Sequence, residues 1–481
     1  MVMLTLTDMF CGAGGSSTGA IQIPDVEVVM AANHWPLAIE THSANHPTTD
    51  HRCADLSQIS PRLFPRTTMG WFSPECTNHT IAKGRKRADA QPDLFGEILP
   101  DEAAERSRAT MWDVVRFTEY HRYELVFVEN VVDAYHWQPF RAWLMAMDSL
   151  GYEHHIVFVN SMHAQAFGPG APQSRDRMYV VFWRKGNRRP DFDRLTRPAA
   201  VCPTCGPVRA IQSWKRADRP LWGRYRAQYV YRCPNVACRN QTVEPAFRSA
   251  AEIIDWDLLG QRIGDRAKPL ADKTMARIQA GIERYWAPLL VPVEGRDGKR
   301  ATPAGQPVRT MTARAETALA FMAELRGGGS KHRPVSDALA TVTASGNHHG
   351  LVTAYYGNGS TKPAGEALAT VTATERHALL TPTGGTWRDA AAPDTDPIAT
   401  RTTRETDGLA FGPAIDINDV LFRMLEPRET KRAMDFPADY VMRGNRREQS
   451  RLAGNAVCPP NARDLVGVGV ESLTPGSETT A

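Results

Sequence analysis

Hydrophobic and polar positions follow two alternating patterns along the first 190 residues. Alternating apolar and polar residues predict a strand at residues 3–8, and short apolar runs predict strands at residues 26–31, 125–128, 156–159 and 178–183. Longer stretches with apolar residues at helical spacing predict helices at residues 111–120 and 140–149. Strands that alternate with helices are typical of an α/β fold with a mostly parallel sheet. We therefore predict one such domain over residues 1–195.

The pattern changes after residue 195. Residues 196–245 carry paired cysteines among basic and aromatic residues, and residues 265–285 read as one helical unit. Residues 246–412 are rich in Thr, Ala, Gly and Pro. Residues 413–481 regain an ordinary globular pattern, and we expect this C-terminal segment to pack back on the first domain.

Short threonine-rich motifs repeat within residues 246–412. Their first threonines are Thr310, Thr341, Thr370 and Thr400, so the period is close to about 30 residues. A leucine follows each motif several residues later, at Leu319, Leu351, Leu379 and Leu409. The repeats either stack as small β units around a shared core or present their turns to bases or phosphates.

Composition limits the class of protein. The chain has 481 residues, 42% of them hydrophobic, and a formal net charge of only +4. No apolar run approaches the roughly 20 residues of a membrane span, and the N-terminus reads as a strand rather than a signal peptide. We therefore expect a cytoplasmic protein.

Basic residues gather in two places. Residues 83–87 hold one cluster, and Arg184, Lys185, Arg188, Arg189, Arg194 and Arg197 form the other. Such clusters are either solvated surface or contacts to phosphates.

The first predicted strand leads into a glycine-rich turn. Phe10, Gly12 and Gly14 lie in this turn, and Ser16 to Thr18 can begin a helix after it. A strand, glycine turn and helix start can cradle a nucleotide-like cofactor, because glycine lets the backbone approach a ligand closely. Asp55 follows at a distance suited to the end of a later strand. Its carboxylate either accepts from an adenine amino group or caps a local turn.

Three further segments carry candidate catalytic residues. Cys76 lies on a predicted loop after the apolar segment 69–72, Glu129 lies at a strand end, and Arg175 and Arg177 precede another strand. Cytosine methylation needs this set. A thiolate that adds to carbon 6 turns the ring into an enamine, a carboxyl group at N3 stabilises the developing charge, and arginines hold the base. The target base must also leave the stack.

Two cysteine pairs suit a metal. Cys202 and Cys205 form one pair, and Cys233 and Cys238 form the other. Two thiolate pairs fit the tetrahedral coordination of structural zinc, and free or redox-active thiols are the alternative. The basic residues between them are Lys215, Arg216, Arg219, Arg224 and Arg226. We leave open whether this predicted zinc ribbon contacts DNA or is only structural.

Together these motifs resemble the DNA cytosine-5 methyltransferase family in their order. Residues 8–15 are similar to its cofactor loop, 74–76 to its Pro-Pro-Cys nucleophile site, and 129–131 to its Glu-Asn-Val motif. Residues 173–177 are similar to its Gln-x-Arg-x-Arg motif. The segments around Arg423, Phe436 and Tyr440 and the Gly-Asn-Ala-Val sequence at 454–457 complete the series.

The resemblance implies a Rossmann-like S-adenosylmethionine-dependent domain, base flipping, and a variable target-recognition region before Arg423. It implies that Cys76 attacks, that Glu129 contacts N3, and that Arg175 and Arg177 position the base. The residues implied to contact S-adenosylmethionine are Phe10, Gly12, Gly14, Asn33, Asp55 and Asn455. The implied partner is duplex DNA, and the implied state is a monomer without a protein partner.

Two positions depart from the family pattern. Glu75 stands where the family usually has proline. A carboxylate facing Cys76 would raise the pKa of the thiol. We therefore predict that Glu75 points away from Cys76. Asn33 stands where the family usually has an acidic residue for the ribose hydroxyls. This departure leaves the affinity and the identity of the cofactor open. The alternatives are an RNA cytosine methyltransferase, transfer of a different group from a modified cofactor, and a binding protein without activity.

Overall fold

The computed structural model describes the chain in two units. The first comprises residues 1–253, 338–347 and 427–481, and the second comprises residues 254–337 and 348–426. Within these bounds, the described residues are 3–74, 102–216, 218–255, 257–258, 260–270, 272–285, 289–290, 302–303, 320–324, 331–334, 338–340, 349–353, 376–382, 392–393, 407–413 and 416–474.

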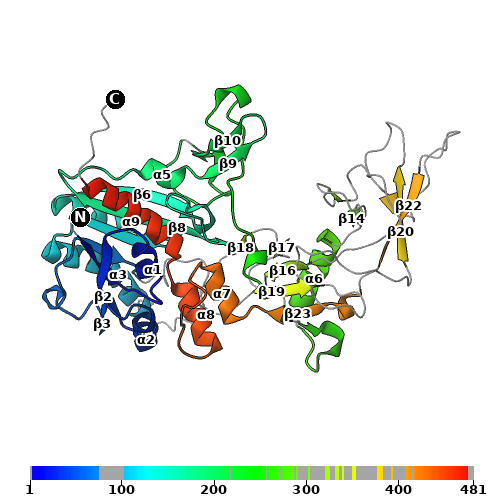
Figure 1. Ribbon diagram of the computed structural model, residues 1–481, viewed down its shortest axis with the longest axis horizontal. Helices are drawn as coiled ribbons and strands as arrows, with labels where there is room; N and C mark the ends of the chain where they lie inside the picture. The colour runs from blue at the N-terminus through cyan, green and yellow to red at the C-terminus, as the bar shows by residue number, and fades with distance from the viewer. Residues whose placement is uncertain are drawn as a thin grey trace, which may run out of the picture. The chain divides into compact units, whose positions relative to one another are not determined.

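A mixed sheet forms the centre of the first unit (Figure 1). Its strand order is β3-β2-β1-β4-β5-β8-β6. The strands are β1 (Leu4–Met9), β2 (Val26–Asn33), β3 (Asp50–Cys53), β4 (Met69–Phe72), β5 (Leu125–Asn130), β6 (Tyr152–Asn160) and β8 (Asp176–Arg184). Strands β1 to β5 pair in parallel, and β8 pairs antiparallel with β5 and β6. The predicted mostly parallel α/β sheet is confirmed.

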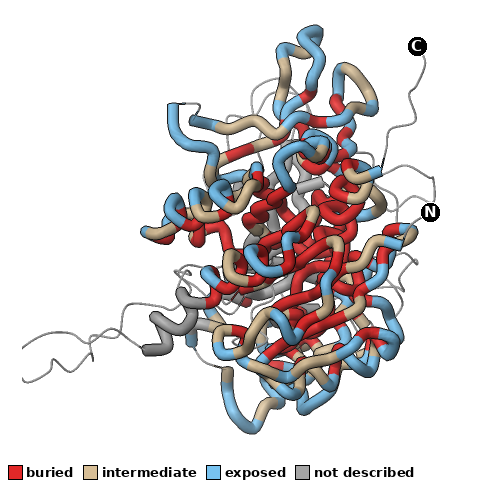
Figure 2. Tube along the Cα trace, turned by 90° about the vertical axis from the view of Figure 1, so that its left-hand side faces the viewer, coloured by how far each residue is buried: buried red, intermediate tan, exposed pale blue. Residues whose placement is uncertain are grey.

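Side chains of β5 show how the sheet is covered on both faces. Val126 and Val128 pack toward α3 (Glu102–His121) and α4 (Phe140–Ser149). Leu125 and Phe127 pack on the opposite face, toward α5 (Phe192–Thr196) and α9 (Pro459–Leu473). Successive strand residues point to opposite faces, so a strand covered on both sides is apolar throughout. Buried residues accordingly gather along the central strands and their covering helices (Figure 2).

Only residues 427–481 of the predicted C-terminal segment belong to the first unit, and their last helix packs on the sheet. Their described helices are α7 (Pro427–Ala433), α8 (Arg446–Asn455) and α9. The carboxylate of Asp464 on α9 accepts from the backbone N–H groups of Ala166 and Phe167 at 2.7 and 3.1 Å. Helix α9 also packs against α1 (Gly15–Ala20), where Ala20 and Ala462 share one apolar cluster.

The cysteine-bearing insert also belongs to the first unit. It consists of two short hairpins, β9 (Ala199–Cys202) with β10 (Gly206–Arg209), and β11 (Ile211–Trp214) with β12 (Tyr229–Arg232). Each strand has only four residues. Hairpins of this size need additional contacts for stability, because an isolated pair of short strands is marginal in water.

The second unit contains a separate sheet of order β13-β23-β19-β16-β17 in its described part. Its strands are β13 (Gln261–Arg262), β16 (Ala320–Glu324), β17 (Lys331–Pro334), β19 (His349–Thr353) and β23 (Leu421–Met424). The remaining described strands are β14 (Leu289–Leu290), β15 (Thr302–Pro303), β20 (Arg376–Pro382), β21 (Ala392–Pro393) and β22 (Asp407–Pro413) in the second unit, and β7 (Gln173–Ser174) and β18 (Leu339–Ala340) in the first. The repeat threonines Thr310, Thr341, Thr370 and Thr400 lie outside the described residues.

Helix α6 (Asp272–Tyr285) corrects one prediction. The helical unit predicted from residue 265 begins seven residues later, after a short 3₁₀ turn that ends at Asp265. Pro269 precedes this start, and proline disfavours the helical conformation in the residue before it. Among the described helices, none is long and apolar enough to span a membrane.

Candidate active site

A hollow of about 200 Å³ lies where the parallel strands of the first unit end. In such sheets, ligands bind outside the carboxyl ends of the strands. Loops after β1, β2, β4 and β5 contribute to the lining, as do the start of β8 and the end of α8. The lining residues are Phe10, Gly12, Asn33, His34, Trp35, Ser73, Pro74, Glu129, Val131, Arg175, Arg177, Arg451, Leu452, Gly454 and Asn455.

Strand direction explains why Glu129 meets Arg177. Strand β8 runs antiparallel to β5, so its beginning lies beside the end of β5, and Glu129 pairs with Tyr179. Arg177 Nε then lies 2.8 Å from Glu129 Oε1, and the two side chains are only 14% and 11% exposed. Because both charges are largely removed from water, each stabilises the other in place.

Asn130 connects this strand end to the loop after β4. Its Nδ2 donates to the carbonyl of Pro74 at 3.4 Å, and its Oδ1 accepts from the backbone N–H of Val131 at 2.8 Å. The backbone N–H of Ser73 donates to the carbonyl of Met9 at 3.2 Å. The start of the loop is therefore tied to two neighbouring strands.

Glu75 and Cys76 lie outside the described residues, so the predicted orientation of Glu75 stays a prediction. The basic cluster at residues 83–87 also lies outside them.

Arg175 extends toward the C-terminal segment. Its Nη2 donates to the carbonyls of Gly454 and Ala456, both at 3.1 Å, and the residue is 2% exposed. Burial and the neighbouring charge of Arg177 lower the pKa of its guanidinium to about 10. Arg175 therefore holds the segment that carries Asn455 against the sheet, a role that spacing in the sequence does not reveal.

The glycine-rich loop is tightly packed behind the hollow. Phe10 and Gly12 have positive φ angles of 59° and 54°, and both line the hollow. Gly14 has φ 87° and is not among the lining residues. A Cβ at Gly14 would lie 2.6 Å from the hydroxyl of Tyr440, which donates to the carbonyl of Ala13. Glycine is needed at position 14 for this close approach as well as for its backbone angle.

A series of hydrogen bonds between buried polar side chains supports the glycine-rich loop. Ser16 and Ser17 donate to Asp8 Oδ2, both at 2.6 Å. Because the Ser17 proton is used there, His42 Nε2 donates to Ser17 Oγ at 2.9 Å, and His51 Nε2 donates to His42 Nδ1 at 2.8 Å.

The ionisable groups of this chain have shifted pKa values. Burial raises the pKa of the Asp8 carboxyl to about 6 against the opposing effect of the serine donors. Burial also lowers the pKa of His42 and His51. The histidines are therefore held neutral at physiological pH.

Asn33 and Asp55 are both predicted to contact the adenosine part of the cofactor, but the structure places only one of them at the hollow. Asn33 ends β2, is 8% exposed, and accepts from the backbone N–H of Trp35 at 2.9 Å. Asp55 follows β3, is exposed, and accepts from the backbone N–H of Ser57 at 3.0 Å. Among the described residues that line the hollow, Asn33 is present and Asp55 is absent.

Sequence reasoning missed several lining residues. The guanidinium carbon of Arg451 lies 4.6 Å from the centre of the Trp35 ring, a cation–π contact at the edge of the hollow. Trp35 carries a weak signal, because it is a large aromatic residue just after a strand end. His34 and Arg451 carry no signal that separates them from ordinary surface residues.

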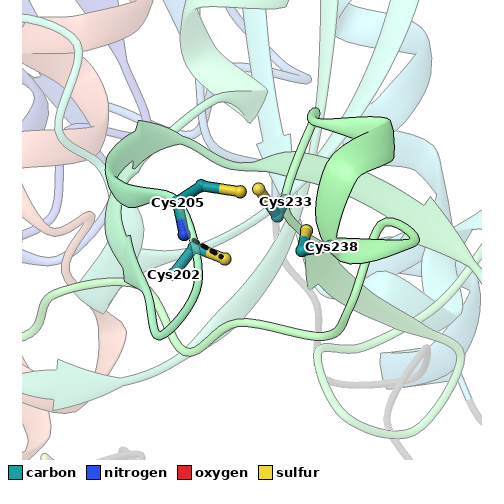
Figure 3. Close-up of side chains that lie close together, drawn as sticks. All are labelled: Cys202, Cys205, Cys233 and Cys238. Carbon is teal, nitrogen blue, oxygen red and sulfur yellow. Dashed lines mark hydrogen bonds between the residues drawn. The ribbon is translucent and has the colours of Figure 1, made fainter.

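The four predicted metal ligands come together (Figure 3). The Sγ atoms of Cys202, Cys205, Cys233 and Cys238 all lie within 4.8 Å of one another. Zn–S bonds of about 2.3 Å in a tetrahedron place sulfurs about 3.8 Å apart. The backbone N–H of Cys205 and Nε2 of Gln241 also donate to Cys202 Sγ, at 3.4 and 2.9 Å. Such donors support a metal-bound thiolate, so the cluster fits zinc.

The basic cluster at residues 184–197 is largely paired with acidic groups. Arg184 contacts Glu124, Lys185 contacts Asp148 and Arg194 contacts Glu471, each at 2.8 Å. Arg197 contacts Asp193 at 2.6 Å. These exposed pairs favour a solvated surface over a phosphate-binding one.

Comparison of the sequence with known protein families identifies the family of this chain. The sequence pattern of the C-5 cytosine-specific DNA methylase family matches residues 4–199 and 341–468, more than half of the chain. The chain belongs to this family. The Type II methyltransferase M.SsoII of Shigella sonnei is 24% identical over 197 residues, which cover 41% of this chain and 46% of that protein. The match thus spans about half the length of that relative.

Comparison with solved structures gives matches with TM-scores below 0.5. The Entamoeba histolytica methyltransferase EhMeth is 12% identical, with a TM-score of 0.46 and coverage of 99% of this chain and 100% of that one. Dnmt2 of S. pombe is 12% identical, with a TM-score of 0.47 and coverage of 98% and 100%. A putative DNA modification methyltransferase encoded within an E. coli prophage is 14% identical, with a TM-score of 0.46 and coverage of 98% and 99%.

Proposed function

We propose that this protein transfers a methyl group from S-adenosylmethionine to carbon 5 of cytosine in duplex DNA, with Cys76 as the nucleophile. The observation that carries the proposal is the single hollow shared by two groups of residues. Glu129 and Arg177 line it together with Phe10, Asn33 and Asn455, although these residues are far apart in the sequence. Pro74 also lines it, and Cys76 follows Pro74 by two residues in the chain.

The chemistry assigns a different task to each side chain. The Cys76 thiolate adds to carbon 6 of a flipped cytosine, which makes carbon 5 nucleophilic. Glu129 shares a proton with N3, which neutralises the negative charge that develops there, while Arg177 holds the Glu129 carboxyl in position. Carbon 5 takes up the methyl group as the S–CH3 bond of the sulfonium breaks and leaves a neutral thioether. Carbon 5 then loses its proton to a base, and the thiolate is expelled as the C5–C6 double bond re-forms.

The cofactor side of the hollow fits S-adenosylmethionine. When bound, this cofactor supplies an electrophilic methyl group. Phe10, Gly12, Asn33 and Asn455 would hold it, and Trp35 offers an aromatic face beside Asn33. Contacts from Gly14 and Asp55 rest on the family resemblance alone. Asn33 in place of an acidic residue is the reason to test a modified donor as well.

The cysteine cluster and the second unit complete the proposal. We infer that Cys202, Cys205, Cys233 and Cys238 bind a structural zinc ion. The insert at 196–245 and the region at 246–412 would recognise the target, and residues 413–481 would close the catalytic domain. The name of M.SsoII, a Type II methyltransferase, favours a restriction–modification setting. A monomer acting on DNA without a protein partner is part of the same proposal.

The test is incubation of purified protein with unmodified plasmid DNA and tritiated-methyl S-adenosylmethionine, beside Cys76→Ala. We expect label in 5-methylcytosine with the natural protein and none with the variant. Bisulfite sequencing then locates the target site, and mass analysis of the nucleoside distinguishes methyl from another group. Label in RNA but not in DNA would replace the proposal with the RNA alternative. Label that persists in Cys76→Ala would overturn the assigned nucleophile.

A further inference from the structure

The cysteine-bearing insert contacts the chain directly after Glu129. Trp222 Nε1 donates to the carbonyl of Val132 at 2.9 Å, and Arg224 Nη2 lies 2.7 Å from Asp133 Oδ2. The ring of Trp222 also lies 4.3 Å, centre to centre, from the ring of His136. All three partners belong to one 3₁₀ turn, Val132–His136, which begins three residues after Glu129.

A second contact reaches the arginine segment. The backbone N–H of Tyr225 donates to Asp176 Oδ1 at 2.9 Å, and Asp176 stands between Arg175 and Arg177 in the chain. Gln212 Nε2 donates to the carbonyl of Phe158 on β6 at 2.8 Å, so the insert also contacts the edge strand of the sheet. Glu129 and Arg177 therefore each have the insert bound to their own segment.

These contacts continue into the metal cluster. Tyr229 and Tyr231 on β12 are fully buried and share one apolar core with Val132 and with Cys202 and Cys233. Strand β12 ends at Arg232, next to Cys233. A metal that holds the four sulfurs would fix the end of the strand whose aromatic residues form this core, because metal-binding energy in small domains is folding energy.

We propose that the four-cysteine insert is a positioning element of the active site, which braces the Glu129 and Arg177 segments when its metal is bound. The expected effect on catalysis rests on the proposed function, whereas the contacts themselves do not. Misplacement of a reacting group by about 1 Å can cost about 100-fold in rate. Loosening the insert should therefore lower kcat, even though none of its described residues lines the hollow.

Variants at the Arg224–Asp133 ion pair distinguish a positioning role of the insert from direct contact with DNA. For Arg224→Ala and Asp133→Ala at saturating DNA and cofactor, we expect kcat to fall about 10-fold, with KM for DNA within about 2-fold of the natural value. Arg224→Lys should recover most of kcat. Arg194→Ala is the matched control, since Arg194 lies outside the insert and forms an exposed ion pair with Glu471 at 2.8 Å. A raised KM for DNA with kcat unchanged would overturn the proposal in favour of DNA contact by Arg224.

Hydrogen exchange provides a readout without turnover. Zinc is removed from the natural protein with a chelator, and exchange is followed in peptides that cover residues 129–137 and 173–178. We expect faster exchange in both after chelation and no change in peptides from β1 and β2. Unchanged exchange at 129–137 and 173–178 would overturn the brace. If the natural protein methylates no nucleic acid, the proposed function fails, while this exchange experiment still decides whether the brace exists.

Discussion

The strand-end site and the cysteine insert are held in place by different forces. Glu129 and Arg177 meet because all six residues of β5 pair with β8, in a register set by backbone hydrogen bonds. The insert has strands of only four residues and reaches the site through side chains such as Trp222 and Arg224. A change at a strand end should alter chemistry and leave the fold intact. A change in the insert should alter local stability first and chemistry as a consequence.

Glu129→Gln should have the largest effect. The amide keeps the volume and an acceptor for Arg177 but loses the carboxyl group, so kcat should fall about 10²- to 10⁴-fold. The melting temperature should change by less than about 2 °C. Glu124→Gln is the control, because Glu124 precedes the opposite end of β5 and forms an exposed pair with Arg184. Equal losses in both variants would contradict a site specific to the strand end.

Cys233→Ser should destabilise the insert. Loss of one thiolate should release the metal and lower the free energy of unfolding by about 2–4 kcal/mol, or the melting temperature by roughly 5–10 °C. Metal content by elemental analysis and thermal unfolding measure these effects. Cys53→Ser is the matched control, since Cys53 is exposed and stands apart from the cluster. A natural protein that carries no metal, or equal destabilisation by both variants, would contradict the zinc assignment.

Asp8→Asn tests the polar support under the glycine loop. The folded-state pKa of Asp8 is about 6, above the ordinary value of a free carboxyl group. The contribution of Asp8 to stability is therefore greatest below about pH 4 and is lost as the pH rises to about 6. Asn cannot titrate, so the stability difference between the two proteins should change by up to about 3 kcal/mol across this window. Urea unfolding at several pH values measures it, and a constant difference would show that the burial of Asp8 has no energetic consequence.

Arg175→Met should have the smallest of these effects. The variant loses two hydrogen bonds to the carbonyls of Gly454 and Ala456. The free energy of unfolding should fall by about 2 kcal/mol, because buried bonds from a charged donor are lost. Binding of S-adenosylmethionine should also weaken, since the same segment carries Asn455. Arg184→Met, at the exposed end of β8, should change neither quantity measurably. Unchanged cofactor binding in Arg175→Met would argue against this anchoring role.

Much of the sheet and part of the hollow could be predicted from the sequence. Apolar runs identified the central strands, because a strand buried on both faces needs apolar side chains at nearly every position. They did not identify β3, whose sequence Asp-His-Arg-Cys is polar. Parallel strands end at one edge, which is why Phe10, Asn33 and Glu129 line one hollow although their motifs are separate in the chain. The cysteine spacing predicted the cluster of four sulfurs for a similar reason, since few other arrangements satisfy two tight thiolate pairs.

Other parts of the site could not be predicted because they depend on long-range contacts of ordinary residues. His42 contacts Ser17 only because α2 (Pro36–Asn45) packs beside the glycine loop. Arg175 contacts Gly454 across most of the length of the chain. No local pattern distinguishes such a histidine or arginine from one that faces solvent.

The sequence by itself determined the central strands, the chemical groups of the site and the cysteine cluster, because periodicity and motif spacing are local properties of the chain. Only the tertiary structure decided which arginine pairs with Glu129, that Asp8 is buried, and that the insert contacts the turn after Glu129. The physical reason is that these interactions depend on which surfaces pack together. Packing depends on the shape and register of whole elements rather than on the identity of any one residue.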